Sequence, residues 1–259
     1  MKNCDKNKQV AYLTVDQVTG ADIHIYNHDV VLKFKTRKKK TGGRVKNKGI
    51  QKYSNASGKR LAFVANNTSV VFKTMITLTY PNEWEKDGRE VKRHLNMFLN
   101  TLRRNNLEYL WFLEFQKRGA PHYHILIDGY CDKDYVAQRW YEIVSSGDEK
   151  HLKAGTRVEK LRSHRGGAHY ATKYAMKRAQ KTPPKQYSNV GRFWGHSSGV
   201  KPECKSVVPD ATFAQVLDCC ADNKRAKNQL ALWFAGGDVP PLSVIFGAGS
   251  EVPSGQDTS

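Results

Sequence analysis

Two β-like segments separated by only four residues place the strongest constraint on the fold of this chain. Residues 107–116 and 121–130 are rich in β-branched and aromatic residues, and residues 117–120 form a short connection that contains glycine. Two such runs joined in this way predict an antiparallel β-hairpin. Because side chains two positions apart on a strand point to the same face, the hairpin buries one set of side chains and presents the other set on the opposite face.

The segments around this hairpin follow a β-α-β-β-α-β order. We therefore expect an α+β fold with a ferredoxin-like or RRM-like βαββαβ core and an antiparallel central sheet. Many unrelated nucleic-acid-binding proteins share that fold, so it leaves the function open. Composition and periodicity predict a strand at 71–80, a helix at 89–105, the two hairpin strands, a helix at 132–145, a strand at 155–162 and a helix at 167–181.

Three regions are expected along the chain. Residues 1–70 predict a basic, β-rich N-terminal extension with short strands and a basic loop. Residues 71–200 hold the βαββαβ core and form the expected catalytic domain. Residues 201–259 predict one helix, near 210–234, followed by a tail rich in Gly, Pro and Ser that we expect to be partly disordered.

The net charge of +19 indicates a polyanionic partner, and its distribution strengthens that inference. No acidic residue lies between Asp29 and Glu83, where thirteen Lys or Arg residues occur, and none lies between Lys160 and Lys201. Ordinary solvated surfaces mix both signs of charge. We expect nucleic acid rather than an anionic membrane, because the sequence shows no long amphipathic helix with a basic polar face.

Composition also argues against a secreted or membrane-bound protein. No segment approaches the roughly 20 apolar residues that span a bilayer, and the polar N-terminus lacks the apolar core of a signal peptide. The five cysteines are odd in number and contain no CxxC pair, which fits reduced thiols rather than disulfides or a zinc ribbon. We therefore expect a cytoplasmic protein.

His122 and His124 lie two positions apart on the second hairpin strand, so they share a face. On the first strand large apolar side chains alternate with Glu114, which places its carboxylate on the histidine side. Two imidazoles and a carboxylate, with positions open for water and phosphate oxygens, suit Mn²⁺ or Mg²⁺ as a Lewis acid. A His-x-His pair alone is more often structural or superficial. Zinc is the second choice of metal, because Cys131, a potential fourth ligand, lies beyond the strand end.

Tyr170 and Tyr174 are four positions apart on the last predicted helix and share a face, as do Lys173 and Lys177. A phenol with a pKa near 10 is a poor nucleophile. Polarisation of a phosphate by a metal and adjacent ammonium groups would make its attack feasible. Without the histidines, tyrosines at this spacing are more often core or DNA-stacking residues.

Four segments in this order resemble the motifs of the HUH (His-hydrophobic-His) endonuclease superfamily, and in particular its phage-type rolling-circle replication initiators. The resemblance covers about residues 55–200. The matching segments are Ile76-Thr77-Leu78-Thr79-Tyr80, Glu114 with His122-Tyr123-His124, Tyr170-Ala171-Thr172-Lys173-Tyr174-Ala175-Met176-Lys177 and Gly191-Arg192-Phe193-Trp194-Gly195.

This resemblance implies a metal-dependent transesterification on single-stranded DNA at a replication origin. A tyrosine attacks a phosphodiester, which leaves a 5′-phosphotyrosine link and a free 3′-OH that primes replication, and reversal rejoins the strand. Tyr174 is the expected nucleophile, and Tyr170 would be a second one, as in two-tyrosine members. Lys177, and Lys173 with it, would steady the phosphate or the leaving group.

The other partners expected from the sequence are origin DNA in duplex or hairpin form and host replication proteins. The chain has no GxxxxGK[ST] segment, so unwinding would depend on a host helicase, alongside a host polymerase. These would be bacterial if a phage encodes the chain. The predicted DNA-contacting residues are Lys38, Lys39, Lys40, Arg44, Arg192 and Trp194.

Two other functions remain compatible with the sequence. One is a different HUH enzyme, a transposase or plasmid relaxase. The other is a non-catalytic RRM-like binding module, which would carry stacking aromatic residues on its open sheet face. Here that face is expected to present Glu114, His122 and His124, which favours the enzyme.

Overall fold

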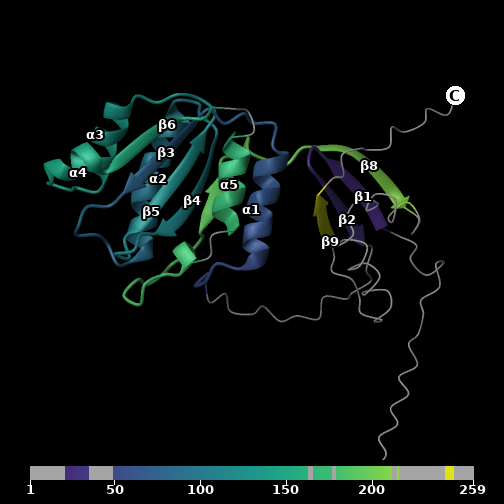
Figure 1. Cartoon of the computed structure of the whole chain (residues 1–259), viewed down its shortest axis with the longest axis horizontal. Helices are drawn as coiled ribbons and strands as arrows, with labels where there is room; N and C mark the ends of the chain where they lie inside the picture. The colour runs from purple at the N-terminus through teal and green to yellow at the C-terminus, as the bar shows by residue number, and fades with distance from the viewer. Residues whose placement is uncertain are drawn as a thin grey trace, which may run out of the picture. The chain divides into compact units, whose positions relative to one another are not determined.

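The computed structural model in Figure 1 describes residues 21–34, 49–162, 166–176, 179–211, 215 and 243–247. It contains two compact units, one of residues 43–202 and one of residues 1–42 together with 203–259. Among the described residues, no helix has both the length and the apolar character needed to cross a bilayer.

The larger unit alternates strands and helices. Its elements are α1 (Asn55–Asn67), β3 (Thr74–Thr79), α2 (Gly88–Arg104), β4 (Tyr109–Phe115), β5 (Pro121–Ile127), α3 (Lys133–Ile143), α4 (Glu149–Ala154), β6 (Thr156–Lys160), α5 (Gly166–Met176), the 3-10 helix η2 (Ala179–Lys181) and β7 (Trp194–His196). The elements of the other unit are β1 (Ala21–Tyr26), β2 (Asp29–Phe34), β8 (Cys204–Ala211) and β9 (Ser243–Gly247).

A five-stranded sheet in the order β6-β3-β5-β4-β7 forms the centre of the larger unit, and every neighbouring pair is antiparallel. β3, α2, β4, β5, α3 and β6 reproduce the predicted β-α-β-β-α-β order, so the α+β prediction is confirmed. The edge strand β7 is an addition that the sequence pattern does not reveal. A strand of three residues is at the short end of the usual range and carries almost no alternation.

The two units divide the chain differently from the boundaries expected at residues 70 and 200. β1 pairs with β2 and β8, and β2 pairs with β9, giving one antiparallel sheet in the order β8-β1-β2-β9. The N-terminal strands therefore fold with segments that follow residue 202. Residues 210 and 211, where the helix near 210–234 was expected to begin, end β8 instead. Nearly all of that predicted helix and of the tail lies outside the described residues.

Helix α1 belongs to the larger unit, although its residues were expected in the N-terminal extension. Ser54 caps it, with its Oγ accepting a hydrogen bond from the backbone N–H of Ser57 at 3.1 Å. α1 packs against α5, and Figure 1 shows the two helices side by side. Gly58 permits this contact, because a Cβ there would lie 3.0 Å from the carbonyl oxygen of Ala175.

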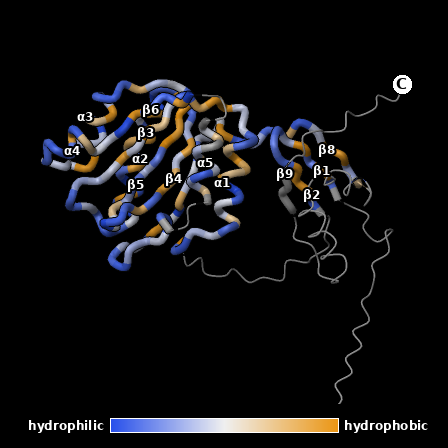
Figure 2. Tube along the Cα trace, viewed as in Figure 1, coloured by the Kyte–Doolittle hydropathy of each residue, from blue (hydrophilic) through white to orange (hydrophobic). Residues whose placement is uncertain are grey.

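Helices cover both faces of the five-stranded sheet. α2 and α3 pack on one face, and α1 and α5 close the other over a smaller cluster. Figure 2 shows that hydrophobic residues concentrate on the strands between these helices. Representative residues of the first cluster are Leu78, Leu95, Trp111, Ile125 and Trp140, and those of the second are Leu61, Phe72, Leu110, Phe112 and Ala171.

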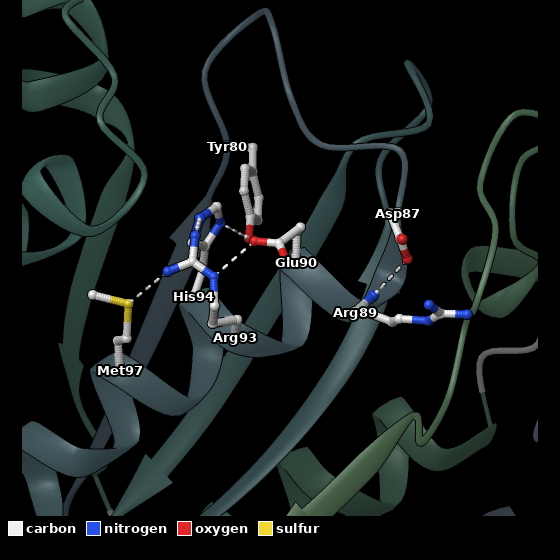
Figure 3. A network of polar contacts seen from close by, with 7 residues as sticks. All are labelled: Tyr80, Asp87, Arg89, Glu90, Arg93, His94 and Met97. Carbon is white, nitrogen blue, oxygen red and sulfur yellow. Dashed lines mark hydrogen bonds and ion pairs between the residues drawn. The ribbon is translucent and has the colours of Figure 1, made fainter.

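Polar contacts fix the start of α2 against the end of β3 (Figure 3). Asp87 caps the helix by accepting the backbone N–H of Arg89 at 2.9 Å. The hydroxyl of Tyr80 lies 3.1 Å from Nδ1 of His94. Burial raises the pKa of Tyr80 well above its usual value, so this phenol stays protonated and can donate that hydrogen bond. These contacts give the α2 face of the sheet a structural role.

Lys92 provides a test of the packing on this face. Its ammonium lies 4.8 Å from the ring centroid of Trp111 and donates to the hydroxyl of Tyr123 at 3.3 Å. Burial lowers the pKa of Lys92 from 10.5 to about 7. Between these values the unfolded chain binds more protons than the folded protein, so the stability of the folded protein rises with pH across this window.

We expect Lys92→Met to stabilise the protein at pH 7 by about 1–2 kcal/mol, because methionine fills the space without a charge to desolvate. The gain should shrink towards pH 10. Urea unfolding of both proteins at the two pH values measures it. An equal difference in unfolding free energy at both pH values would contradict the assignment.

Candidate active site

The two histidines and Glu114 lie side by side on one face of the sheet, as predicted. In the antiparallel register, His122 lies opposite Thr79 on β3 and opposite Glu114 on β4. His124 lies opposite Thr77. Directly opposed residues on neighbouring strands point to the same face. The centre of the sheet therefore presents two threonines, two imidazoles and a carboxylate together.

The threonines hold the imidazoles in place. Oγ1 of Thr77 lies 3.2 Å from Nδ1 of His124, and Oγ1 of Thr79 lies 3.1 Å from Nδ1 of His122. With each Nδ1 engaged, Nε2 is the nitrogen of each ring that can bind a further group. The sequence contains a signal for this role, because the Thr-x-Thr spacing on β3 repeats the His-x-His spacing on β5. Without the register, that signal does not identify the pairs.

Burial sets the protonation of these groups. It lowers the pKa of His122 to about 4, and the neighbouring His124 adds to this effect, so His122 is neutral at pH 7. Burial alone would raise the pKa of Glu114, but the hydrogen bond with His124 and the ammonium of Lys181 outweigh it, and the net pKa is lowered. At neutral pH a neutral imidazole thus lies near an ionised carboxylate, the states that ligands to a metal require.

Glu114 is paired with a cation of the protein itself. Nζ of Lys181 lies 3.1 Å from Oε1 of Glu114 and also donates to the carbonyl oxygen of Tyr174. The Lys181 side chain is 0% exposed and that of Glu114 is 5% exposed. The ammonium also lies 5.2 Å from the ring centroid of Tyr53. Sequence reasoning missed this partner, because no local pattern links two residues 67 positions apart.

Tyr174 lies directly against this cluster. Its ring stacks on His124, with centroids 4.5 Å apart and planes at 29°, and it contacts Phe112 at 4.9 Å. Tyr170 stacks on Tyr174 at 6.3 Å, one helical turn earlier. Burial, followed by the nearby Glu114 carboxylate, raises the pKa of Tyr174, so its hydroxyl is protonated at neutral pH. Of the two candidate nucleophiles, Tyr174 is the one that contacts a histidine in the described structure.

The other predicted site residues are not part of this cluster. Lys173 is exposed on α5, and Lys177 lies outside the described residues. The remaining predicted contacts are DNA-binding ones: Lys38, Lys39, Lys40 and Arg44 lie outside the described residues, Arg192 is exposed just before β7, and Trp194 lies on β7.

The donor types at this site fit a divalent metal, although three ligands are not gathered around one point. Nε2 of His124 lies 3.5 Å from Oε2 of Glu114. Two ligands of one cation can have that separation when each metal–donor distance is about 2.0–2.3 Å. Within the part of the chain that the structure describes, no group of three or more His, Cys, Asp or Glu side chains is arranged to hold a metal ion. The cation that neutralises Glu114 here is the Lys181 ammonium.

Comparison with known families bears on the same segment. Residues 73–179 match the family model of the replication-associated protein ORF2. The matched segment runs from the start of β3 into η2, so it includes Glu114, both histidines and both tyrosines, and Lys181 lies two residues beyond it. The match supports the replication-associated part of the resemblance seen in the sequence. No curated protein and no solved structure matches the chain.

Removal of Lys181 tests the buried ion pair. In Lys181→Met, the Glu114 carboxylate would stay buried without its cation, and such a loss typically costs about 3–5 kcal/mol of unfolding free energy. We expect a cost in that range from urea unfolding at pH 7. The double variant Glu114→Gln/Lys181→Met should recover a large part of it, because no buried charge remains. Equal stability of the single and double variants would show that the pair is not coupled.

Proposed function

We propose that this chain initiates DNA replication by nicking and rejoining single-stranded DNA, with Tyr174 as the nucleophile. The observation that carries the proposal is the stacking of Tyr174 on His124, in one cluster with His122 and Glu114. A phenol beside two imidazoles and a carboxylate, under a helix rather than on an open surface, suits covalent catalysis on a phosphodiester. The replication-associated family match over the same residues supports the biological setting.

The proposed reaction is a transesterification. The phenolic oxygen of Tyr174 forms a bond to phosphorus, the bond from phosphorus to the 3′ oxygen breaks, and that oxygen takes up a proton. The products are a 5′-phosphotyrosine link and a free 3′-OH, which would prime synthesis by a host polymerase after unwinding by a host helicase. Attack by that 3′-OH on the same link rejoins the strand. Glu114, His122 and His124 would hold Mn²⁺ or Mg²⁺, whose Lewis acidity polarises the phosphate.

The chain's own residues prepare Tyr174 for this step. The raised pKa of Tyr174 means that its proton must be removed as the bond forms. Lys181 links the carbonyl oxygen of Tyr174 to the Glu114 carboxylate, which makes it a positioning residue for the nucleophile. Thr77 and Thr79 orient the imidazoles. Lys173, exposed on α5, would approach the phosphate of a bound strand.

The packing of the sheet counts against the non-catalytic alternative. An RRM-like module binds bases on aromatic residues of an open sheet face. Here α1 and α5 close the face that carries His122 and His124 over a buried cluster. Bases therefore have no open platform on that face. A transposase or relaxase would use the same chemistry, and the replication-associated match favours an initiator.

A covalent-adduct assay tests the proposal. The full chain is incubated with Mn²⁺ and a pool of random single-stranded oligonucleotides labelled at the 3′ end, and the products are separated under denaturing conditions. The label should migrate with the protein, because the 3′ fragment stays bound to the tyrosine. We expect the adduct to fall below detection in Tyr174→Phe and in His122→Ala, and on chelation of Mn²⁺.

The matched controls are two other tyrosines. Tyr130→Phe changes a phenol that is 62% exposed and remote from the cluster, and it should leave the adduct yield unchanged. Tyr170→Phe should retain the first cleavage. An undiminished adduct in Tyr174→Phe would overturn the choice of nucleophile, and the absence of any adduct in the unaltered chain would count against nicking as a whole.

A further inference from the structure

Two hollows flank the edge strand β7, one on either side of it. One of about 400 Å³ opens towards α1, with Ser57 and Arg60 in its lining. The other, of about 320 Å³, opens towards α2, with Asn96 and Arg103 in its lining. Both lists of lining residues include Arg192, Gly195 and His196, so the hollows meet over β7. We call the combined feature the β7 groove.

The β7 groove is basic. Arg60, Arg103 and Arg192 are exposed and line it, and Lys92 lies at its floor. No acidic residue occurs among the described lining residues of either hollow. The positive character is local rather than a consequence of the net charge. The hollow beside Tyr80, in the same unit, is lined by three acidic residues: Glu83, Glu85 and Asp148.

Aromatic rings line the same groove. Trp194 and His196 project from β7 with ring centroids 6.0 Å apart and planes at 25°, which gives a nearly continuous flat surface. Trp194 is held in position because its Nε1 donates to Oγ of Ser57 at 2.9 Å. Trp111 lines the far side, and Gly195 allows it to approach, since a Cβ on Gly195 would lie 2.9 Å from Nε1 of Trp111.

We propose that the β7 groove is a binding site for single-stranded DNA, with phosphates on Arg60, Arg103 and Arg192 and bases on Trp194 and His196. Arginines beside flat aromatic rings are the combination that binds unpaired strands, because each base offers a π-face and each linkage a charge. In a duplex the base faces are already stacked, so rings of this kind have no surface to cover. The choice of DNA as the partner rests on the proposed function.

The groove lies close enough to the candidate active site for one strand to contact both. β7 pairs with β4, and β4 pairs with β5, which carries the histidines. Two inter-strand spacings amount to about 10 Å. Phe112 connects the two places directly: it lies opposite Trp194 in the register and its ring contacts Tyr174 at 4.9 Å. The groove would hold DNA that flanks the scissile phosphate.

Binding measurements on the full chain with Tyr174→Phe, in chelator and without metal, test the groove separately from nicking. The probe is a fluorescent single strand of mixed sequence, about 20 nucleotides long to exceed a typical single-strand site, read by anisotropy over a range of salt concentrations. Adding Arg60→Ala/Arg192→Ala should raise Kd by about tenfold or more. It should also reduce the slope of log K against log salt by about 1.4, since each phosphate contact on a single strand contributes about 0.7.

Two further variants make the test specific. Lys150→Ala/Lys153→Ala removes the same charge from exposed positions on α4, which packs against β6 at the opposite edge of the sheet. Its Kd should stay within about twofold of the parent value. His196→Ala should weaken single-strand binding about fivefold or more through lost stacking and leave duplex binding unchanged.

The outcomes separate the groove from the proposed function. If the arginine pair matters no more than the α4 lysine pair, or if all groove variants weaken duplex and single strand equally, the groove proposal is wrong. Thermal unfolding of each variant, monitored by circular dichroism, checks that the fold is intact. Absence of the covalent adduct together with normal groove binding would contradict nicking alone.

Discussion

The antiparallel register of β3, β5 and β4 is the constraint on which the candidate site depends. It sets Thr77 against His124, Thr79 against His122, and Glu114 against His122. A shift of one residue in any of these strands would turn its side chains to the other face. The large apolar side chains of the same strands prevent that shift, because they fill the core beneath α2 and α3. Packing on one face thus fixes the polar site on the other.

Closure of that second face gives the site its electrostatic character. α1 and α5 cover it, so Glu114 and His124 are buried and their interactions are weakly screened. A buried carboxylate needs a partner, and Lys181 supplies one while also holding the backbone of the helix that carries Tyr174. The cation that neutralises the site and the element that carries the nucleophile are therefore mechanically linked. Any ligand that competes for Glu114 would act on that link.

The distribution of charge separates the two ends of the larger unit. Arginines gather around β7, where aromatic rings are also exposed, while the hollow beside Tyr80 is acidic. A polyanion is therefore attracted to one edge of the sheet rather than to the whole surface. That edge is two strands from the histidines. The arrangement suits a protein that holds a single strand beside a nucleophile.

The sequence by itself determined the α+β core and the sharing of one face by Glu114, His122 and His124, because both follow from short-range periodicity. It did not reveal α1, whose apolar spacing is interrupted by Gly58 and polar residues, or the short strand β7. Only the tertiary structure decided that Lys181 is the partner of Glu114, that Tyr174 rather than Tyr170 contacts His124, and that the N-terminal strands pair with β8 and β9. These contacts join segments far apart in the chain, and no local pattern encodes which distant residues meet when the sheet and its helices pack.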